Sequence, residues 1–390
     1  IKNENNKIFI FFNFTIVAFL CLKLNRYSDF GNDASAHIFY FFLMSIAFKN
    51  FEKFTKKNMG EVLTVGAYIV FNKITLFLGS LIPLIILIFK KKINLFNLKI
   101  IFFITLFSVS FFTKNLLVSG CFAFPIEKTC VTNIFWYDLD GNRGSNAKMT
   151  MLENEAWTKG WSDQKENRKN FEEYLSNLDW VTLWSKNHGK RVLIKMIPFL
   201  LLLIIITLII FRFAFNKKNT NLINKNFSYK KIFFAFLVIN IIGSIMWFFK
   251  FPVFRYGSSY LVSALGIFTT IICWNKIQLI DVLKLKKVLG YFIIFLLFVL
   301  ISKNLLRIIK NFDQSYKDSP WPKIYSETKS NEKNRNKPIY KDNIIIFYQS
   351  TKGLCYYNTS PCTHMLDNQF NEDEIFFKKK WKYKIFYFLR

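Results

Sequence analysis

The chain has 390 residues, of which 52% are hydrophobic and 19% aromatic, and its formal charge at pH 7 is +29. Its apolar runs are longer than a soluble core needs, which excludes an ordinary globular domain. Lys, Asn, Ile and Phe are abundant together, as AT-rich codons favour, and no zinc pattern or RNA-binding signature accompanies the charge. Codon usage and membrane topology therefore explain the charge better than a nucleic-acid partner does.

The clearest apolar run is Met196–Phe215, which carries a single charged residue. About 20 apolar residues cross the ~30 Å hydrocarbon core as a helix. The run lies mid-chain, unlike a signal peptide, so it predicts a spanning helix. We expect an all-α polytopic membrane protein with about nine transmembrane helices, near residues 8–24, 36–48, 61–72, 74–90, 99–113, 192–214, 231–249, 258–274 and 289–305.

Lysine-rich segments orient these spans, because cytoplasmic loops carry an excess of Lys and Arg. Segment 62–90 is either one long span or a hairpin broken near Asn72-Lys73. Basic residues flank it at 49–58 and 90–92, and a hairpin places both groups in the cytoplasm, so the hairpin is preferred. The other basic loops then lie on the same side, with the N-terminus inside and the C-terminus outside.

This topology divides the chain into four parts, two of them external. We expect an amphipathic helix at 167–184, either lying on the membrane surface or folded onto its own loop. The predicted parts are an N-terminal transmembrane bundle at 1–113 with a first external loop at 25–35, a large external (periplasmic) loop at 114–191, C-terminal transmembrane helices at 192–305, and an external tail at 306–390.

The six cysteines follow the same division. Cys121 and Cys130 fall in the external loop and Cys355 and Cys362 in the tail, whereas Cys21 and Cys273 fall within spans. Close pairs in external segments fit an oxidising compartment and predict the disulfides Cys121–Cys130 and Cys355–Cys362. A four-cysteine zinc site is the alternative, but the spacings are wider than in the usual knuckles.

The first external loop, "NRYSDFGNDASAHIFYFF" (25–42), contains candidate catalytic residues. Asp29, Asp33 and His37 are spaced four apart, so Asp33 and His37 share a face if a helix begins near Asp33. A carboxylate at the mouth of a membrane cavity can act as a general base, or hold a divalent ion with a second carboxylate. The alternative is that Asp33 caps the helix.

The turn "KFPVFRYGSSY" (250–260) holds Arg255, one of only nine arginines. An arginine at the membrane mouth can bind a lipid-linked phosphate through bidentate hydrogen bonds. It can equally be an interfacial anchor beside Phe254 and Tyr256. Lys114, at the external end of a predicted span, either snorkels or binds the same anion.

Four short motifs carry a resemblance. Asp33, "KNLLVSGCFAFP" (114–125), "PVFRYG" (252–257) and the tail pair "CYYNTSPC" resemble a group of bacterial multi-pass membrane proteins similar to GT-C glycosyltransferases. The resemblance implies a polyprenyl-phosphate donor, with Asp33 as catalytic base and Arg255 as a phosphate ligand. The paired acidic motif of such enzymes reads Asn32-Asp33 here, so no cofactor is certain, although a divalent cation is possible.

The expected function is therefore a membrane glycosyltransferase of the bacterial inner membrane. It would move a sugar from a polyprenyl-phosphate donor to an envelope glycan or lipid acceptor on the outer face. Asp33 and Asp29 are the candidate catalytic residues, and the candidate substrate-binding residues are His37, Lys114, Arg255 and Tyr256. The alternatives are an envelope polysaccharide polymerase or ligase, and a non-enzymatic transporter or scaffold, for which Asn72-Lys73 and Arg212 are the only hints.

Overall fold

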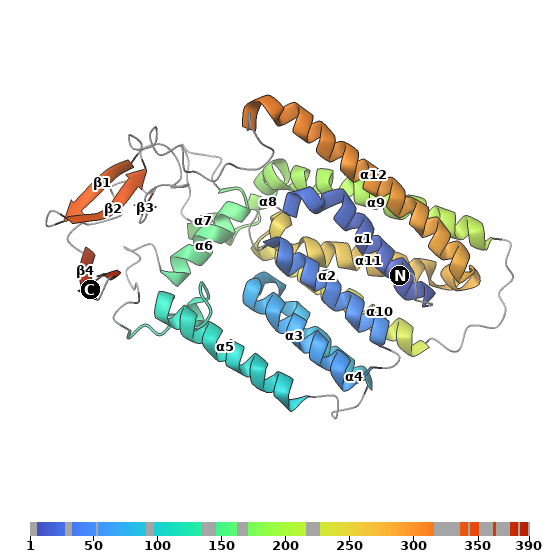
Figure 1. Cartoon of the computed structure of the whole chain (residues 1–390), viewed down its shortest axis with the longest axis horizontal. Coiled ribbons are helices and arrows are strands. Elements are labelled where there is room, and N and C mark those ends of the chain that lie inside the picture. The colour runs from blue at the N-terminus through green and yellow to red at the C-terminus, as the bar shows by residue number, and fades with distance from the viewer. Residues whose placement is uncertain are drawn as a thin grey trace. The chain divides into compact units, whose positions relative to one another are not determined.

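The structure is a computed structural model (Figure 1). It describes residues 6–27, 33–51, 54–90, 97–134, 137, 146–161, 171–215, 227–315, 336–341, 344–350, 362–363, 375–380 and 383–388. Two compact units divide the chain. The first comprises Ile1–Phe111 with Leu152–Leu306, and the second Phe112–Met151 with Arg307–Arg390.

Helices make up most of the first unit. The α-helices are α1 (Lys7–Tyr27), α2 (Asp33–Asn50), α3 (Lys56–Asn72), α4 (Ile82–Lys90), α5 (Leu98–Ser119), α6 (Ala147–Thr158), α7 (Phe171–Ser176), α8 (Trp180–Trp184), α9 (Lys190–Ala214), α10 (Phe227–Lys250), α11 (Phe254–Leu279) and α12 (Val282–Ser315). The 3₁₀ segments η2 (Ile74–Leu81) and η4 (Glu127–Thr129) and the π turn η6 (Ser185–Gly189) complete the helical elements.

Five helices in the described part of the chain are long and apolar enough to cross a membrane. Their length and composition make the chain a membrane protein, as the sequence predicts. The total of about nine spans and the GT-C arrangement stay predictions. The five helices are Leu98–Ser119, Trp180–Ala214, Lys230–Lys250, Phe254–Leu279 and Val282–Ile309.

The ambiguous segment 62–90 folds as a hairpin. Helix α3 ends at Asn72, and Lys73 is extended, with φ −149° and ψ 98°. Segments η2 and α4 then pack back against α3. The two arms are in contact at Gly66, where a Cβ would lie 3.9 Å from the carbonyl oxygen of Gly79, an ordinary van der Waals distance. The predicted break near Asn72-Lys73 is therefore present.

Aromatic side chains pack the centre of the first unit. Phe48 of α2 stacks on Phe233 of α10, with ring centroids 3.8 Å apart, and Phe12 of α1 meets Phe48 edge to face. Phe12, Phe48 and Phe233 are fully buried. These contacts draw α1, α2 and α10 together, so the abundant Phe residues form a shared core as well as a lipid-facing surface.

Helices α10 and α11 pack through two aromatic–glycine contacts. The Tyr260 ring of α11 covers Gly243 of α10, and the Trp247 ring of α10 covers Gly257 of α11. A Cβ at Gly257 would clash with the Trp247 indole. Small residues allow this close helix approach in membranes, and here they fix the first turn of α11, where Arg255 lies.

The first unit has a basic end, defined by Lys7, Lys49, Lys90, Lys276 and Lys284. Lys7 donates to the carbonyl of Gln278 at 2.9 Å, and Lys90, Lys276 and Lys284 lie over the rings of Phe51, Phe211 and Phe213. These contacts gather the ends of α2, α4, α9 and α11 with the starts of α1 and α12. At the opposite end, called here the site end, α2 and α11 begin and α3 finishes.

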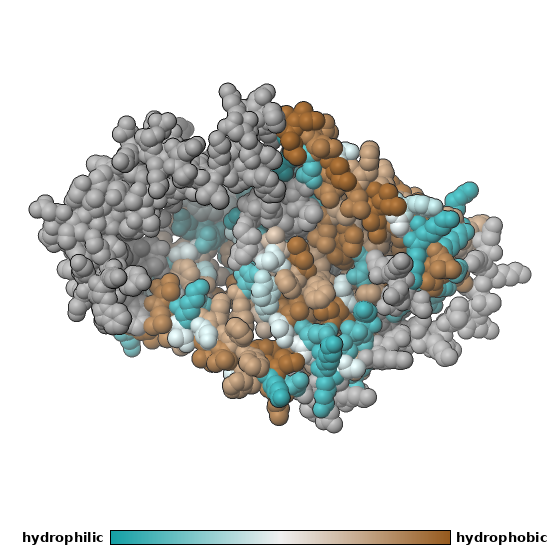
Figure 2. All heavy atoms as spheres, viewed as in Figure 1, coloured by the Kyte–Doolittle hydropathy of each residue, from teal (hydrophilic) through white to brown (hydrophobic). Residues whose placement is uncertain are grey.

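Apolar side chains cover the outer faces of α5 and α12. Phe102, Phe107, Phe298 and Ile301 are among those more than half exposed. Figure 1 shows α5 and α12 as outer helices, and Figure 2 shows hydrophobic side chains gathered over α12 and its neighbours. In water such surfaces would cost free energy, whereas lipid chains solvate them.

The expected helix at 167–184 is wrong as a single element. It contains two short helices, α7 and α8, with a break at 177–179, and α8 continues through η6 into α9. Trp180 is buried against Phe248 of α10, with ring centroids 5.6 Å apart. Packing against the bundle, and not the helical periodicity of the segment, therefore determines its conformation.

The second unit contains the described strands. In one sheet β1 (Asn336–Lys341) pairs antiparallel with β2 (Ile344–Ser350), which pairs parallel with β3 (Cys362–Thr363). In the other, β4 (Ile375–Lys380) pairs antiparallel with β5 (Tyr383–Phe388). Runs such as "IIIFYQ" and "YKIFYF" are rich in β-branched and aromatic residues, which favour strands. The helical prediction is thus confirmed for the apolar part of the chain, and the tail adds strands that it did not include.

Candidate functional site

The turn that leads into α11 is held by side chains from several elements. Trp184 Nε1 donates to the carbonyl of Pro252 at 2.6 Å, and Trp247 Nε1 donates to that of Val253 at 2.8 Å. Thr75 Oγ1 of η2 donates to the carbonyl of Tyr256 at 3.1 Å. Because the three donors lie on separate elements, they restrain the backbone of this turn more than a loop without such bonds would be restrained. The turn is therefore pre-organised.

His37 holds the same turn from α2. It is fully buried, with Nε2 2.6 Å from the carbonyl oxygen of Arg255 and Nδ1 2.6 Å from Ser259 Oγ. A carbonyl oxygen can only accept, so Nε2 carries a proton; in the neutral ring Nδ1 then accepts from the Ser259 hydroxyl. His37 thereby fixes the backbone of Arg255, 218 residues away in the sequence.

Asp33, Lys73 and Arg255 form an ionic cluster at the site end. Lys73 Nζ lies 2.6 Å from Asp33 Oδ1 and donates at 2.6 Å to the Arg255 carbonyl. Arg255 Nε is 3.9 Å from Asp33 Oδ2. The side chains of Lys73 and Asp33 are only 7% and 16% exposed, whereas that of Arg255 is 42% exposed. The carboxylate therefore lies between a buried and a solvent-accessible cation.

Lys73 occupies the bend between α3 and η2, where its charge is partly desolvated. Burial lowers the pKa of Lys73, and the hydrogen bond and charge of Asp33 oppose that shift. Asn72, beside it, donates to Ser35 Oγ of α2 at 2.8 Å. The bend of the hairpin is thus tied to the first turn of α2, which fixes Asp33.

Tyr256 supports both cations of the cluster. Its hydroxyl accepts a hydrogen bond from Arg255 at 2.7 Å. Its ring lies 4.9 Å from Lys73 Nζ and 4.8 Å from the Arg255 guanidinium carbon. The negative face of an aromatic ring attracts cations. Tyr256 therefore helps to hold two positive groups near each other.

A cavity of about 210 Å³ opens beside Arg255. Its basic lining comes from two places: His188, Arg191 and Lys195 lie around the start of α9, and Arg255 lies in the first turn of α11. Apolar side chains complete the lining, namely Val192, Val253 and Phe254. None of the lining residues among those described is acidic. The arrangement suits an anion with an apolar neighbour.

Sequence reasoning did not identify His188, Arg191, Lys195 or Lys73 as site residues. A signal was present in "HGKRVLIK" (188–195), where His188, Arg191 and Lys195 follow the i, i+3, i+7 spacing of one helix face. Lys73 carried a second signal, since the predicted topology puts it on the side of the membrane that Lys and Arg usually avoid.

The other predicted site residues have mixed outcomes. Asp29 and Cys355 lie outside the described residues. Lys114 is exposed on α5 in the second unit, whereas the ionic cluster belongs to the first. In the described part of the chain, no three His, Cys, Asp or Glu side chains converge as a metal site would require. Cys21 and Cys273 are free thiols within helices, as expected.

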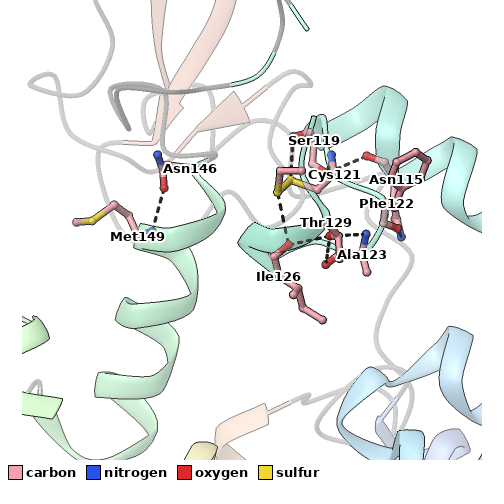
Figure 3. The surroundings of a disulfide bond; sticks show 10 residues. Asn115, Ser119, Cys121, Phe122, Ala123, Ile126, Thr129, Asn146 and Met149 are labelled. Carbon is pink, nitrogen blue, oxygen red and sulfur yellow. Dashed lines mark hydrogen bonds between the residues drawn. A yellow bond between two sulfur atoms is a disulfide. The ribbon is translucent and has the colours of Figure 1, made fainter. Parts of the chain in front are cut away.

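The disulfide Cys121–Cys130 is present in the second unit (Figure 3). The loop that it closes is also held by Phe122, whose backbone N–H donates to the Thr129 carbonyl at 3.0 Å. Asn115 of α5 donates through its side chain to the Phe122 carbonyl at 3.1 Å. The bridge and these bonds make the residues after α5 a compact loop. This prediction is confirmed.

One family model matches the chain. It describes a domain of unknown function, DUF8201, and covers residues 1–262. The chain belongs to this family. The matched region includes the whole ionic cluster and every residue that lines the cavity. No curated protein and no solved structure matches the chain.

Proposed function

We propose that the protein is a membrane glycosyltransferase that takes a sugar from a polyprenyl-phosphate donor. One observation carries the proposal. Asp33 and Arg255, assigned to different steps from separate motifs, approach within 3.9 Å at one end of the bundle. Arg255 also lines a cavity rich in basic side chains. A carboxylate that can act as a base and a guanidinium that can bind phosphate are two groups that transfer from a lipid phosphate uses.

The distribution of lysines supports an outward-facing site. Lys7, Lys49, Lys90, Lys276 and Lys284 define the basic end, which the positive-inside rule assigns to the cytoplasm. The ionic cluster lies at the opposite end, where α2 and α11 begin. The site would then open to the outer face of a bacterial inner membrane, where an envelope glycan or lipid acceptor is available.

The chemistry follows from the charges in the cluster. Lys73 engages Asp33 Oδ1, so Oδ2 accepts the proton of the acceptor hydroxyl. The hydroxyl oxygen attacks the anomeric carbon, and the bond from that carbon to the phosphate oxygen breaks with inversion. Its electron pair leaves with the phosphate, whose charge Arg255 stabilises. His37 acts as a positioning residue, because both of its ring nitrogens bind protein groups.

The ion pair also favours a second candidate function. The 2.6 Å contact between Asp33 and the buried Lys73 is also what we expect of an ion pair that only fixes the hairpin bend against α2. In that case Asp33 only fixes the start of α2, which is compatible with a non-enzymatic transporter or scaffold.

Replacement of Asp33 by Asn separates the catalytic role of this carboxylate from a structural one. Asn can still accept a hydrogen bond from Lys73 but cannot take a proton. We expect sugar transfer from a polyprenyl-phosphate donor in membranes to fall about 10²–10⁴-fold. Asp281→Asn is the matched control, because Asp281 also begins a helix, accepting from the Leu283 N–H at 3.2 Å, but between α11 and α12.

The control variant should transfer sugar at the wild-type rate. Protein amount and thermal unfolding are measured for both variants, so that a folding defect is not taken for a catalytic one. A folded Asp33→Asn protein with unchanged transfer would refute the role of Asp33 as base. Asp29→Asn would then be assayed as the alternative base. Wild-type membranes that transfer no more sugar than membranes lacking the protein would favour the non-enzymatic function.

A further inference from the structure

We propose that the cavity beside Arg255 binds the diphosphate group of a lipid-linked substrate. This inference rests on the proposed function and narrows it, because it assigns three new residues and a diphosphate as the group they recognise. The new residues are His188, Arg191 and Lys195, which share one face around the start of α9.

The position of these side chains is not explained by topology. Lys and Arg accumulate in the cytoplasmic loops of membrane proteins, yet the cavity lies beside the cluster at the site end, away from Lys7, Lys276 and Lys284. Arginine is also scarce in this chain, with nine in 390 residues, and two of the nine line this one cavity. A bound anion gives a physical reason for the placement.

The charges favour a doubly charged ligand. Arg191, Lys195 and Arg255 place three basic side chains around about 210 Å³, and Asp33, 3.9 Å from Arg255 Nε, offsets part of the charge on one of them. A bound anion would be attracted by all three basic groups. A sugar-linked monophosphate carries one negative charge, whereas a sugar-linked diphosphate carries two. Two guanidinium groups can each bind phosphate oxygens in a bidentate way, so the cavity suits two phosphates better than one.

The backbone around the cavity is pre-organised for such a ligand. Trp184, at the end of α8, donates to the Pro252 carbonyl at 2.6 Å and so joins the α8–α9 segment to the turn before α11. Lys195 lies over the Phe254 ring at 4.9 Å. The two sides of the cavity are therefore fixed to each other, and little ordering is needed when an anion binds.

A lipid source is favoured by the apolar part of the cavity lining. Val192, Val253 and Phe254 lie beside the basic side chains there, and the helices α9 and α11 that carry or adjoin them are apolar and long enough to cross a membrane. An isoprenoid chain attached to the diphosphate could lie against them inside the bilayer. A free diphosphate would make no use of these side chains.

Binding to the purified full chain in detergent tests the inference without any sugar transfer. The probes are farnesyl diphosphate, farnesyl monophosphate, inorganic pyrophosphate and farnesol, titrated by calorimetry. Farnesyl diphosphate should bind at least about tenfold tighter than each of the others, since each of them lacks a phosphate or the lipid chain. Excess phosphatidylglycerol should not displace it.

The variants Arg191→Gln and Lys195→Gln should each weaken farnesyl diphosphate binding about 10- to 100-fold, as expected for a lost charge-assisted hydrogen bond. Lys190→Gln and Lys186→Gln are matched controls, because both lysines are exposed on the same segment and neither lines the cavity. Both controls should bind as the wild type does.

Three outcomes would overturn the proposal: equal binding of monophosphate and diphosphate, equal losses in the controls, or pyrophosphate that binds as tightly as the lipid. The result is independent of the transfer assay. Asp33→Asn should still bind farnesyl diphosphate, so a failed catalytic assignment and a failed diphosphate site give different patterns.

Discussion

The two ends of the first unit carry cations in different ways. At the basic end Lys7 caps a carbonyl, and Lys90, Lys276 and Lys284 lie over single aromatic rings. At the site end Lys73 is buried against Asp33 and also binds a backbone carbonyl. The first pattern is what topology and snorkelling produce. The second has to be stabilised by specific partners, as in a binding site or a structural ion pair.

Topology can explain the difference between the basic end and the site end only if the two ends lie on opposite sides of the membrane. Alkaline phosphatase matures only outside the cytoplasm, so a fusion after residue 310 should be active and one after residue 280 inactive. Residue 280 lies between α11 and α12, near the basic end. Activity should differ between the two fusions in an all-or-none manner.

Fusion protein levels are compared by immunoblot to exclude unequal expression. An active fusion at 280 together with an inactive one at 310 would reverse the orientation and place the site in the cytoplasm.

Removal of one charge from each end tests whether their energetics differ. Lys73→Met leaves Asp33 without its buried partner. This should lower the free energy of unfolding by about 3 kcal/mol, which is the lower part of the range for a broken buried pair, because Arg255 remains near the carboxylate. Lys284→Met removes an exposed cation over Phe213, worth about 0.5–1 kcal/mol. Both values come from denaturant unfolding in detergent.

The double variant Asp33→Asn/Lys73→Met sharpens this test. It should recover part of the loss seen for Lys73→Met, since no carboxylate is then left unpaired. Equal losses for Lys73→Met and Lys284→Met would mean that the ionic cluster has no special energetic role.

Two glycines test the packing that fixes Arg255. A Cβ at Gly257 of α11 would clash with Trp247, so Gly257→Ala should destabilise the fold by about 1–3 kcal/mol. At Gly290 of α12 a Cβ would meet no other described atom within 4 Å, so Gly290→Ala should be neutral or stabilise by up to ~1 kcal/mol through helix propensity. Thermal unfolding in detergent measures both.

If the two alanine variants have the same stability, α11 is free to shift away from α10, and the rigid turn before Arg255 is not a consequence of this contact. Retained binding of farnesyl diphosphate by Gly257→Ala would lead to the same conclusion about the cavity.

The sequence predicted local features reliably. The apolar run at 196–215, the break near Asn72-Lys73 and the disulfide Cys121–Cys130 are all present. Each depends on neighbouring residues: hydropathy over one helix length, a polar pair between apolar runs, and two thiols nine positions apart. The prediction of a single helix at 167–184 is wrong because the helical periodicity of the segment does not account for the packing of Trp180 on Phe248 of α10.

The sequence by itself determined that the chain belongs in a membrane. It also indicated Asp33, His37 and Arg255 as candidate site residues, each from its own motif and without a link between them. Only the tertiary structure decided that they meet, that Lys73 pairs with Asp33, and that the face of α9 adds Arg191 and Lys195 beside Arg255. Hydropathy is a sum over adjacent residues, so a linear sequence displays it directly. A cluster of charged groups depends on which helix ends are neighbours. The packing of Phe48 on Phe233 and of Trp247 on Gly257 decides this, and these contacts join residues too far apart in the sequence for a local pattern to reveal.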